Sequence, residues 1–110
     1  MIEESQVDWG GHANSAEYIQ GEMRSLNQVV NYCLDYQKKH PKVLVVLTSD
    51  HETGGTIVHD GDDGNLDIEF AISHHSASIV PIWATGPGAE VFDGFMDNTE
   101  IGKVLMGYLK

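Results

Sequence analysis

Two short stretches of this sequence carry side chains that could bind a metal ion. The first is the string Asp-His-Glu-Thr-Gly-Gly at residues 50–55, and the second joins Glu3 to Asp8 and His12 near the N-terminus. Carboxylates and imidazoles are good zinc ligands. The two glycines that end the first string let the backbone turn and approach a ligand closely. Together these stretches predict a metallohydrolase site.

The element that should position the first string is the apolar run Val43–Ser49, which directly precedes it. A short run of β-branched residues and leucine is typical of a strand buried on both faces. Ligand sites in open α/β sheets lie just beyond the carboxyl ends of such strands. We therefore expect this strand to deliver Asp50 and His51 to the site.

The first half of the chain otherwise predicts one long helix. Residues 1–12 resemble the end of a strand followed by a loop, and Asn14 with Glu17 has the spacing of a capping box. Pro41 should end the helix. Its apolar face repeats at steps of three and four residues, through Ala16, Ile19, Met23, Leu26, Val30 and Cys33.

The second half predicts shorter elements. A β-prone segment at residues 56–59 leads into a turn at residues 60–65, and residues 67–72 fit either a strand or a short helix. Residues 79–85 should form another buried strand, which Gly86-Pro87-Gly88 ends, and Asp97 with Glu100 should cap a final helix. Because strands and helices alternate, we predict an α/β fold, a sheet with flanking helices in one domain spanning residues 1–110.

Composition narrows the classes of partner. The chain has 110 residues, with 17 acids, 6 bases and a formal charge of −11. This balance argues against binding to nucleic acid or to anionic membrane surfaces. Some of the carboxylates are expected to be compensated by divalent cations instead. Cys33 is the single cysteine, so no internal disulfide is possible.

The ligand residues and their surroundings resemble the C-terminal part of the alkaline phosphatases. The Asp-His-Glu-Thr-Gly-Gly string is highly specific within the wider superfamily of phosphatases, sulfatases and phosphomutases. The resemblance covers nearly the whole chain and is weakest between Thr56 and Ser73. It rests on Glu3, Asp8–Asn14, Thr48–Gly55, His75 eleven residues before Gly86, and Asp97–Ile101.

This resemblance implies three metal sites. A first zinc ion, which binds the leaving-group oxygen, would be held by Asp8, His12 and His75. A second zinc ion, which activates a serine nucleophile, would be held by Asp50 and His51. A magnesium ion would take Glu3 as a ligand. Two metal ions about 4 Å apart can stabilise the entering and leaving oxygens of an in-line displacement.

The resemblance also implies that the chain is a fragment. In this family the serine nucleophile, further metal ligands and a phosphate-binding arginine lie N-terminal to the matching segment. The parent would be a periplasmic or secreted enzyme, often dimeric, that hydrolyses phosphate monoesters through a phosphoserine. The isolated chain should be inactive. It is also short between Gly55 and His75, where the family often carries a long insertion.

Several alternatives remain open at this point. The chain could come from another superfamily member, such as a phosphodiesterase or a phosphomutase. It could also be a metal-binding or interaction module, a homo-oligomer, or a chain that pairs with a partner through an exposed strand edge. Ser49 is interpreted as structural, and His74 and Glu4 are neighbours that compete with His75 and Glu3. Glu52 could orient His51 or be a solvated carboxylate.

Overall fold

A computed structural model describes residues 1–108. Contacts divide the chain into two compact units. Unit 1 comprises residues 1–31 and 51–80, and unit 2 comprises residues 32–50 and the chain from Pro81 onward. The long helix α2, Ala16–Lys39, begins in the first unit and ends in the second.

Unit 1 begins with a helix that the sequence did not predict. Helix α1 covers Gln6–His12, where a strand end and a loop were expected. Its two glycines, Gly10 and Gly11, are poor helix formers, but they allow close packing. A Cβ atom on Gly10 would lie 2.8 Å from Cγ1 of Ile19, and one on Gly11 would lie 2.8 Å from the carbonyl oxygen of Thr53. Tertiary packing therefore outweighs the weak helix propensity of glycine.

Asn14 ends α1 and does not cap α2, which corrects the sequence-based prediction. It adopts the left-handed conformation, with φ of 48°, and its N–H donates to the carbonyl of Gly11. Asparagine is a common residue at this position after a helix. The cap of α2 is Ser15, whose Oγ accepts a hydrogen bond of 3.3 Å from the N–H of Tyr18. The helix ends at Lys39, before Pro41, as predicted.

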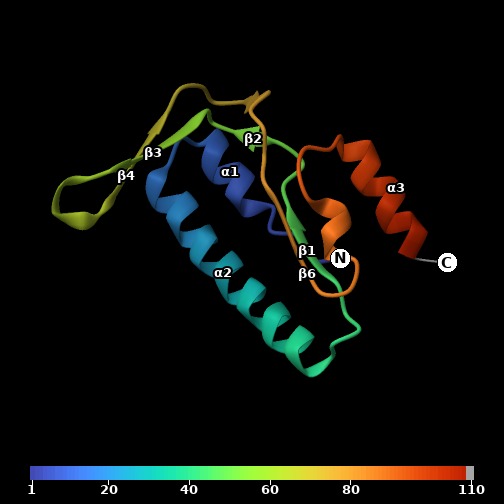
Figure 1. Cartoon of the computed structure of the whole chain (residues 1–110). Coiled ribbons are helices and arrows are strands. Elements are labelled where there is room, and N and C mark those ends of the chain that lie inside the picture. The colour runs from blue at the N-terminus through green and yellow to red at the C-terminus, as the bar shows by residue number, and fades with distance from the viewer. Residues whose placement is uncertain (109–110) are drawn as a thin grey trace. The chain divides into compact units, whose positions relative to one another are not determined.

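The rest of unit 1 consists of two small antiparallel sheets. Strand β2, Glu52–Thr53, pairs with β5, His75–Ser76. Strand β3, Thr56–Asp60, pairs with β4, Leu66–Phe70, and the short 3-10 helix Asp62–Gly64 closes this hairpin. Figure 1 shows the hairpin extending away from α1 and β2. Residues 66–70 are therefore a strand, which resolves the ambiguity left by the sequence.

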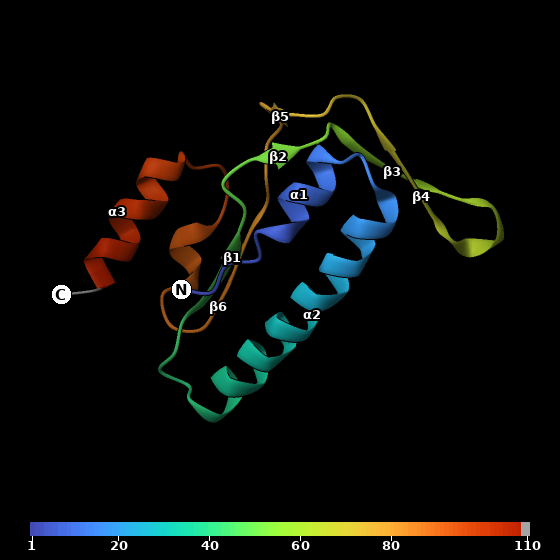
Figure 2. The same ribbon diagram turned by 180° about the vertical axis from the view of Figure 1, so that it is seen from behind.

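Unit 2 contains a third antiparallel pair and the last helix (Figure 2). Strand β1, Val45–Thr48, pairs with β6, Ile82–Thr85, which begins directly after Pro81. Gly86 follows with φ of 109°, and a Cβ atom there would lie only 2.3 Å from the carbonyl oxygen of Val43. The 3-10 helix Ala89–Phe92 and helix α3, Asn98–Tyr108, complete the unit.

Burial in β1 differs from the expectation. The sequence predicted a strand buried on both faces, but Val45 to Leu47 are half-buried and Thr48 is exposed. Among the described residues its single strand partner is β6, so the run lacks the neighbours of an interior strand. Phe92 is the one large apolar side chain that is buried in the described part of the chain. The apolar pattern of β1 correctly gave the strand but not its depth.

The prediction of a mixed helix and strand fold is confirmed, in the form of small sheets with flanking helices. Within residues 1–108, no helix combines the length and apolar character required to cross a lipid bilayer.

Candidate metal centre

Helix α1 supplies the first two side chains of a cluster in unit 1. Asp8 and His12 are one turn apart, so both project from the same face of the helix. Oδ1 of Asp8 lies 3.6 Å from Nε2 of His12. Gly11, between them in the sequence, brings this face close to Thr53 of β2. The helix that the sequence did not predict is thus what places Asp8 beside His12.

Asp8 is held by the string at residues 50–55. The hydroxyl of Thr53 donates a hydrogen bond of 2.6 Å to Oδ1 of Asp8. This hydrogen bond is the main cause of a lowered pKa at Asp8, and the neighbouring His12, His75 and His51 lower the pKa further by favouring a negative charge. Asp8 is therefore an ionised carboxylate at neutral pH, which is the form that binds a cation.

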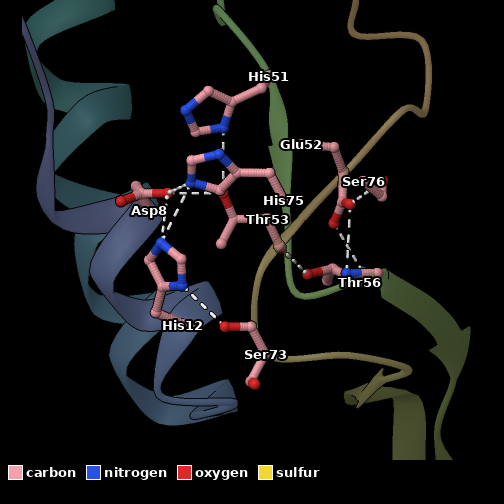
Figure 3. Close-up of polar contacts among 10 residues, drawn as sticks. Asp8, His12, His51, Glu52, Thr53, Thr56, Ser73, His75 and Ser76 are labelled. Carbon is pink, nitrogen blue, oxygen red and sulfur yellow. Dashed lines mark hydrogen bonds and ion pairs between the residues drawn. The ribbon is translucent and has the colours of Figure 1, made fainter.

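His75 completes a triangle of donor atoms. It lies on β5 directly opposite Thr53 in the antiparallel register. Its Nε2 is 3.4 Å from Oδ1 of Asp8 and 3.2 Å from Nε2 of His12. Figure 3 shows the three side chains converging from α1 and from the segment that carries β5.

The dimensions of this triangle fit a zinc ion. Ligands about 2.0–2.1 Å from a tetrahedral zinc ion are about 3.3 Å from one another. The three separations between Asp8, His12 and His75 are 3.2, 3.4 and 3.6 Å. Two imidazole nitrogens and one carboxylate oxygen also match the preference of zinc for nitrogen and oxygen ligands. The donor set therefore fits this metal in both chemistry and spacing.

The outer nitrogen of His12 is fixed by the backbone. Its Nδ1 lies 2.8 Å from the carbonyl oxygen of Ser73, which can only accept a hydrogen bond. Nδ1 must therefore carry the proton, and Nε2 presents its lone pair toward Asp8 and His75. Histidines that bind metals usually donate their second nitrogen in this way.

His51 joins the same cluster from the start of the string. Its ring stacks on the ring of His75, with centroids 3.6 Å apart and an interplanar angle of 21°. Its Nδ1 lies 3.2 Å from Oγ1 of Thr53. Asp8, His51 and His75 each offer a ligand atom, and these atoms lie within 4.8 Å of one another.

Glu52 organises the turn that follows. It accepts hydrogen bonds from the N–H groups of Gly55, at 3.2 Å, and Thr56, at 2.8 Å, and from the hydroxyl of Ser76. Burial raises the pKa of Glu52, but these hydrogen bonds outweigh it and the pKa lies below its usual range. These contacts correspond neither to orientation of His51 nor to a solvated carboxylate. Glu52 instead holds the Gly54-Gly55 turn and β5 together.

The structure brings together four of the six predicted ligands, namely Asp8, His12, His51 and His75. Glu3 is exposed ahead of α1, and no described hydrogen bond or ion pair joins it to the cluster. Asp50 is the last residue of a segment that belongs to unit 2, whereas the cluster belongs to unit 1. The neighbour His74 contributes its carbonyl, which accepts a hydrogen bond from the N–H of Gly54.

The sequence did not predict the roles of two residues of this centre, Thr53 and Ser73. Thr53 was visible as part of the string, but nothing in its spacing indicated that its hydroxyl would reach Asp8, 45 residues away. The carbonyl of Ser73 could not have been found, because a backbone acceptor leaves no signature in the sequence.

Comparison with known proteins assigns the family. The model of the alkaline phosphatase family matches residues 1–64, which is more than half of the chain. Alkaline phosphatase 3 of Bacillus subtilis is 28% identical over 175 aligned residues, which include 94% of this chain and 38% of that protein. The alignment is longer than the chain, so the relative carries additional residues within the matched region.

Solved structures agree. The alkaline phosphatase of the Antarctic bacterium TAB5 is 38% identical, with a TM-score of 0.80 over 89% of this chain and 31% of that one. A mutant of the same enzyme has been solved with Mg bound in a site called M3. The cold-active enzyme of a psychrophilic Shewanella has the same fold, with a TM-score of 0.88 at 20% identity over 99% of this chain and 44% of that one.

The chain spans less than half the length of each of these relatives. The match to the family model and the identity to the TAB5 enzyme nevertheless agree with the Asp-His-Glu-Thr-Gly-Gly string and with the convergence of its histidine on Asp8. The chain therefore belongs to the alkaline phosphatase family.

Proposed function

We propose that this chain supplies metal ligands to an alkaline phosphatase that hydrolyses phosphate monoesters. Asp8, His12 and His75 would hold a first zinc ion, and Asp50 and His51 a second. When bound, the two ions would stabilise the entering and leaving oxygens at the phosphorus. The observation that supports this most directly is the triangle of donor atoms, with sides of 3.2, 3.4 and 3.6 Å.

The residues of the chain would each have a defined task. Asp8 would contribute negative charge, because the Thr53 hydrogen bond and three histidines keep its pKa low. His12 would present Nε2, because its Nδ1–H donates a hydrogen bond to the Ser73 carbonyl. Glu3 would be a ligand to magnesium. That role is proposed from the family pattern, and a TAB5 mutant with Mg bound in its M3 site supports magnesium as a cofactor of the family.

The test is native mass spectrometry of the 110-residue chain during titration with zinc. We expect one or two ions to bind, and we expect Asp8→Ala and Asp50→Ala each to reduce this binding. The matched control for the two aspartates is Asp67→Ala on the β3–β4 hairpin. A second control, His59→Ala, removes an imidazole from the same hairpin, where His59 is opposite Asp67 and its Nε2 lies 3.9 Å from Glu69. Absence of specific binding, or equal losses in the controls, would contradict the proposed ligands.

Catalysis by the 110 residues alone is not expected. No residue among them matches the serine nucleophile of the family. The purified chain should therefore fail to hydrolyse p-nitrophenyl phosphate at any zinc and magnesium concentration. Metal-dependent hydrolysis that disappears in Asp50→Ala would show that the chain carries its own nucleophile.

We further propose that strand edges allow this chain to pair with another segment or with a second copy. Each of the three described sheets has only two strands, so every strand has one side without a strand partner in the described residues. Such edges template pairing. Analytical ultracentrifugation over a wide concentration range tests this, and a strict monomer with a cooperative melt would contradict it.

A further inference from the structure

Thr53 lies where the two ligand segments of unit 1 meet. Its hydroxyl is 2.6 Å from Oδ1 of Asp8 and 3.2 Å from Nδ1 of His51. Its backbone is paired with His75 across the β2–β5 register. One half-buried side chain thus contacts ligands proposed for two different zinc ions, and Figure 3 shows it between them.

The direction of the two hydrogen bonds at Oγ1 of Thr53 follows from the number of protons available there. A threonine hydroxyl has one proton to donate, and an ionised carboxylate can only accept. The short contact to Asp8 therefore uses the hydroxyl proton. The remaining capacity of Oγ1 is as an acceptor, so the proton of the 3.2 Å contact must come from Nδ1 of His51. His51 is then left with an unprotonated Nε2.

We propose that Thr53 is a positioning residue that selects the Nδ1-protonated tautomer of His51 and orients the carboxylate of Asp8. This inference rests on the metal function proposed above and extends it to a residue that binds no metal itself. Ser73 performs the same task for His12 with a backbone carbonyl. For His51 the acceptor is a side chain, and a single substitution can remove it.

The first experiment needs no metal. In the ¹⁵N-labelled, metal-free 110-residue chain at a pH where the rings are neutral, NMR distinguishes the protonated from the bare nitrogen of each histidine. We expect the Nδ1-protonated form of His51 in the wild type and in Thr53→Ser, which retains the hydroxyl. Thr53→Val, which removes it at similar shape, should shift His51 toward the Nε2-protonated form. A His51 tautomer that is identical in all three would overturn the proposal.

The second experiment measures zinc affinity by competition with a chelator. Loss of an outer hydrogen bond to metal ligands typically weakens binding about tenfold to a hundredfold, which is the effect expected for Thr53→Val. Thr53→Ser should remain close to wild type. The control is Thr56→Val, which removes a hydroxyl from the same turn. The Thr56 hydroxyl donates a hydrogen bond of 3.0 Å to the backbone carbonyl of Thr53.

The two experiments separate the failure of each proposal. If Thr53→Val and Thr56→Val weaken zinc equally, the hydroxyl serves the turn and not the ligands, and the positioning role is wrong. If the wild-type chain binds no zinc, the proposed metal function fails. The tautomer measurement still decides whether Thr53 controls His51. Circular dichroism of each variant confirms that the comparison is made between folded chains.

Discussion

At the scale of single residues, small side chains determine how closely the ligand segments approach one another. Gly11 is buried against Thr53, and Thr53 in turn contacts Asp8. A glycine in a helix normally costs stability relative to alanine. At this position the missing side chain is what allows the helix to lie against β2. Gly21 of α2 has no such neighbour, since a Cβ atom there would meet nothing within 4 Å.

These two helical glycines should respond oppositely to the same substitution. Gly11→Ala should destabilise the chain by about 1–3 kcal/mol, because the new methyl group is forced onto Thr53. It should also weaken zinc binding, because Thr53 holds Asp8. Gly21→Ala should stabilise the chain by about 0.5–1 kcal/mol and leave zinc binding unchanged. Urea denaturation and zinc titration of both variants provide the check. A stabilised Gly11→Ala would show that α1 does not pack as described.

At the scale of elements, the sequence predicted those features that depend on local patterns. The long apolar periodicity and Pro41 gave α2 and its end, and Asp97 with Glu100 gave the start of α3. Helix α1 was missed, because Gly10 and Gly11 are poor helix formers and the packing that compensates for them comes from distant residues. The depth of β1 was misjudged because an apolar run predicts burial but not the number of neighbouring strands.

The candidate metal centre shows the same contrast between what local patterns predict and what tertiary packing determines. Ligand types and their spacing indicated Asp8, His12, His51 and His75, whereas their mutual distances depend on the β2–β5 register and on α1. The hydrogen bonds from Thr53 and to Ser73 connect residues 45 and 61 positions apart. Contacts of that range follow from the tertiary fold, so no local pattern could have predicted them.

The start of α3 offers a test of capping that depends on pH. Oδ1 of Asp97 accepts hydrogen bonds from the N–H of Thr99 at 2.9 Å and from its hydroxyl at 2.7 Å, and the N–H of Asp97 donates to Glu100 at 2.9 Å. The side-chain and backbone hydrogen bonds from Thr99 lower the pKa of Asp97 from its ordinary value of 3.8. Because this pKa is lower in the folded state, the ionised cap stabilises the fold at pH values above the ordinary pKa. The stabilisation is lost as the pH falls through the lower pKa of the folded state.

The amide resonance of Thr99 should report this titration directly. In the wild type it should move with a midpoint below 3.8, the ordinary pKa of the aspartate. Asp97→Asn keeps an acceptor at the cap but cannot ionise, so the movement should disappear while the helix remains. Asp97→Ala should fray the first turn at every pH. Asp93→Asn, four residues earlier, serves as the charge-matched control and should leave the titration intact. A midpoint at or above 3.8 would contradict the capping geometry.

At the scale of the whole molecule, the proposed first zinc site lies entirely within unit 1. Asp8, His12 and His75 all belong to this unit, and the hydrogen bond from His12 to Ser73 joins α1 to the segment that precedes β5. A metal ion held by all three would add a connection between α1 and β5. Binding to the folded state alone stabilises it, by about 2.7 kcal/mol at a metal concentration one hundred times the dissociation constant.

Zinc should therefore protect the two units unequally. Hydrogen exchange followed by mass spectrometry should show slower exchange in α1, β2 and β5 when zinc is added, and EDTA should reverse the effect. Exchange in α3, Asn98–Tyr108, should change little, since none of the proposed zinc ligands lies on this helix, whereas Asp50, proposed for the second ion, follows β1 closely. Asp8→Ala should abolish the protection of α1, which carries Asp8 and His12, and Asp67→Ala should retain it. Equal protection of α3 and α1 would show that zinc acts on the chain as one cooperative unit, and that the division into two units does not describe its stability.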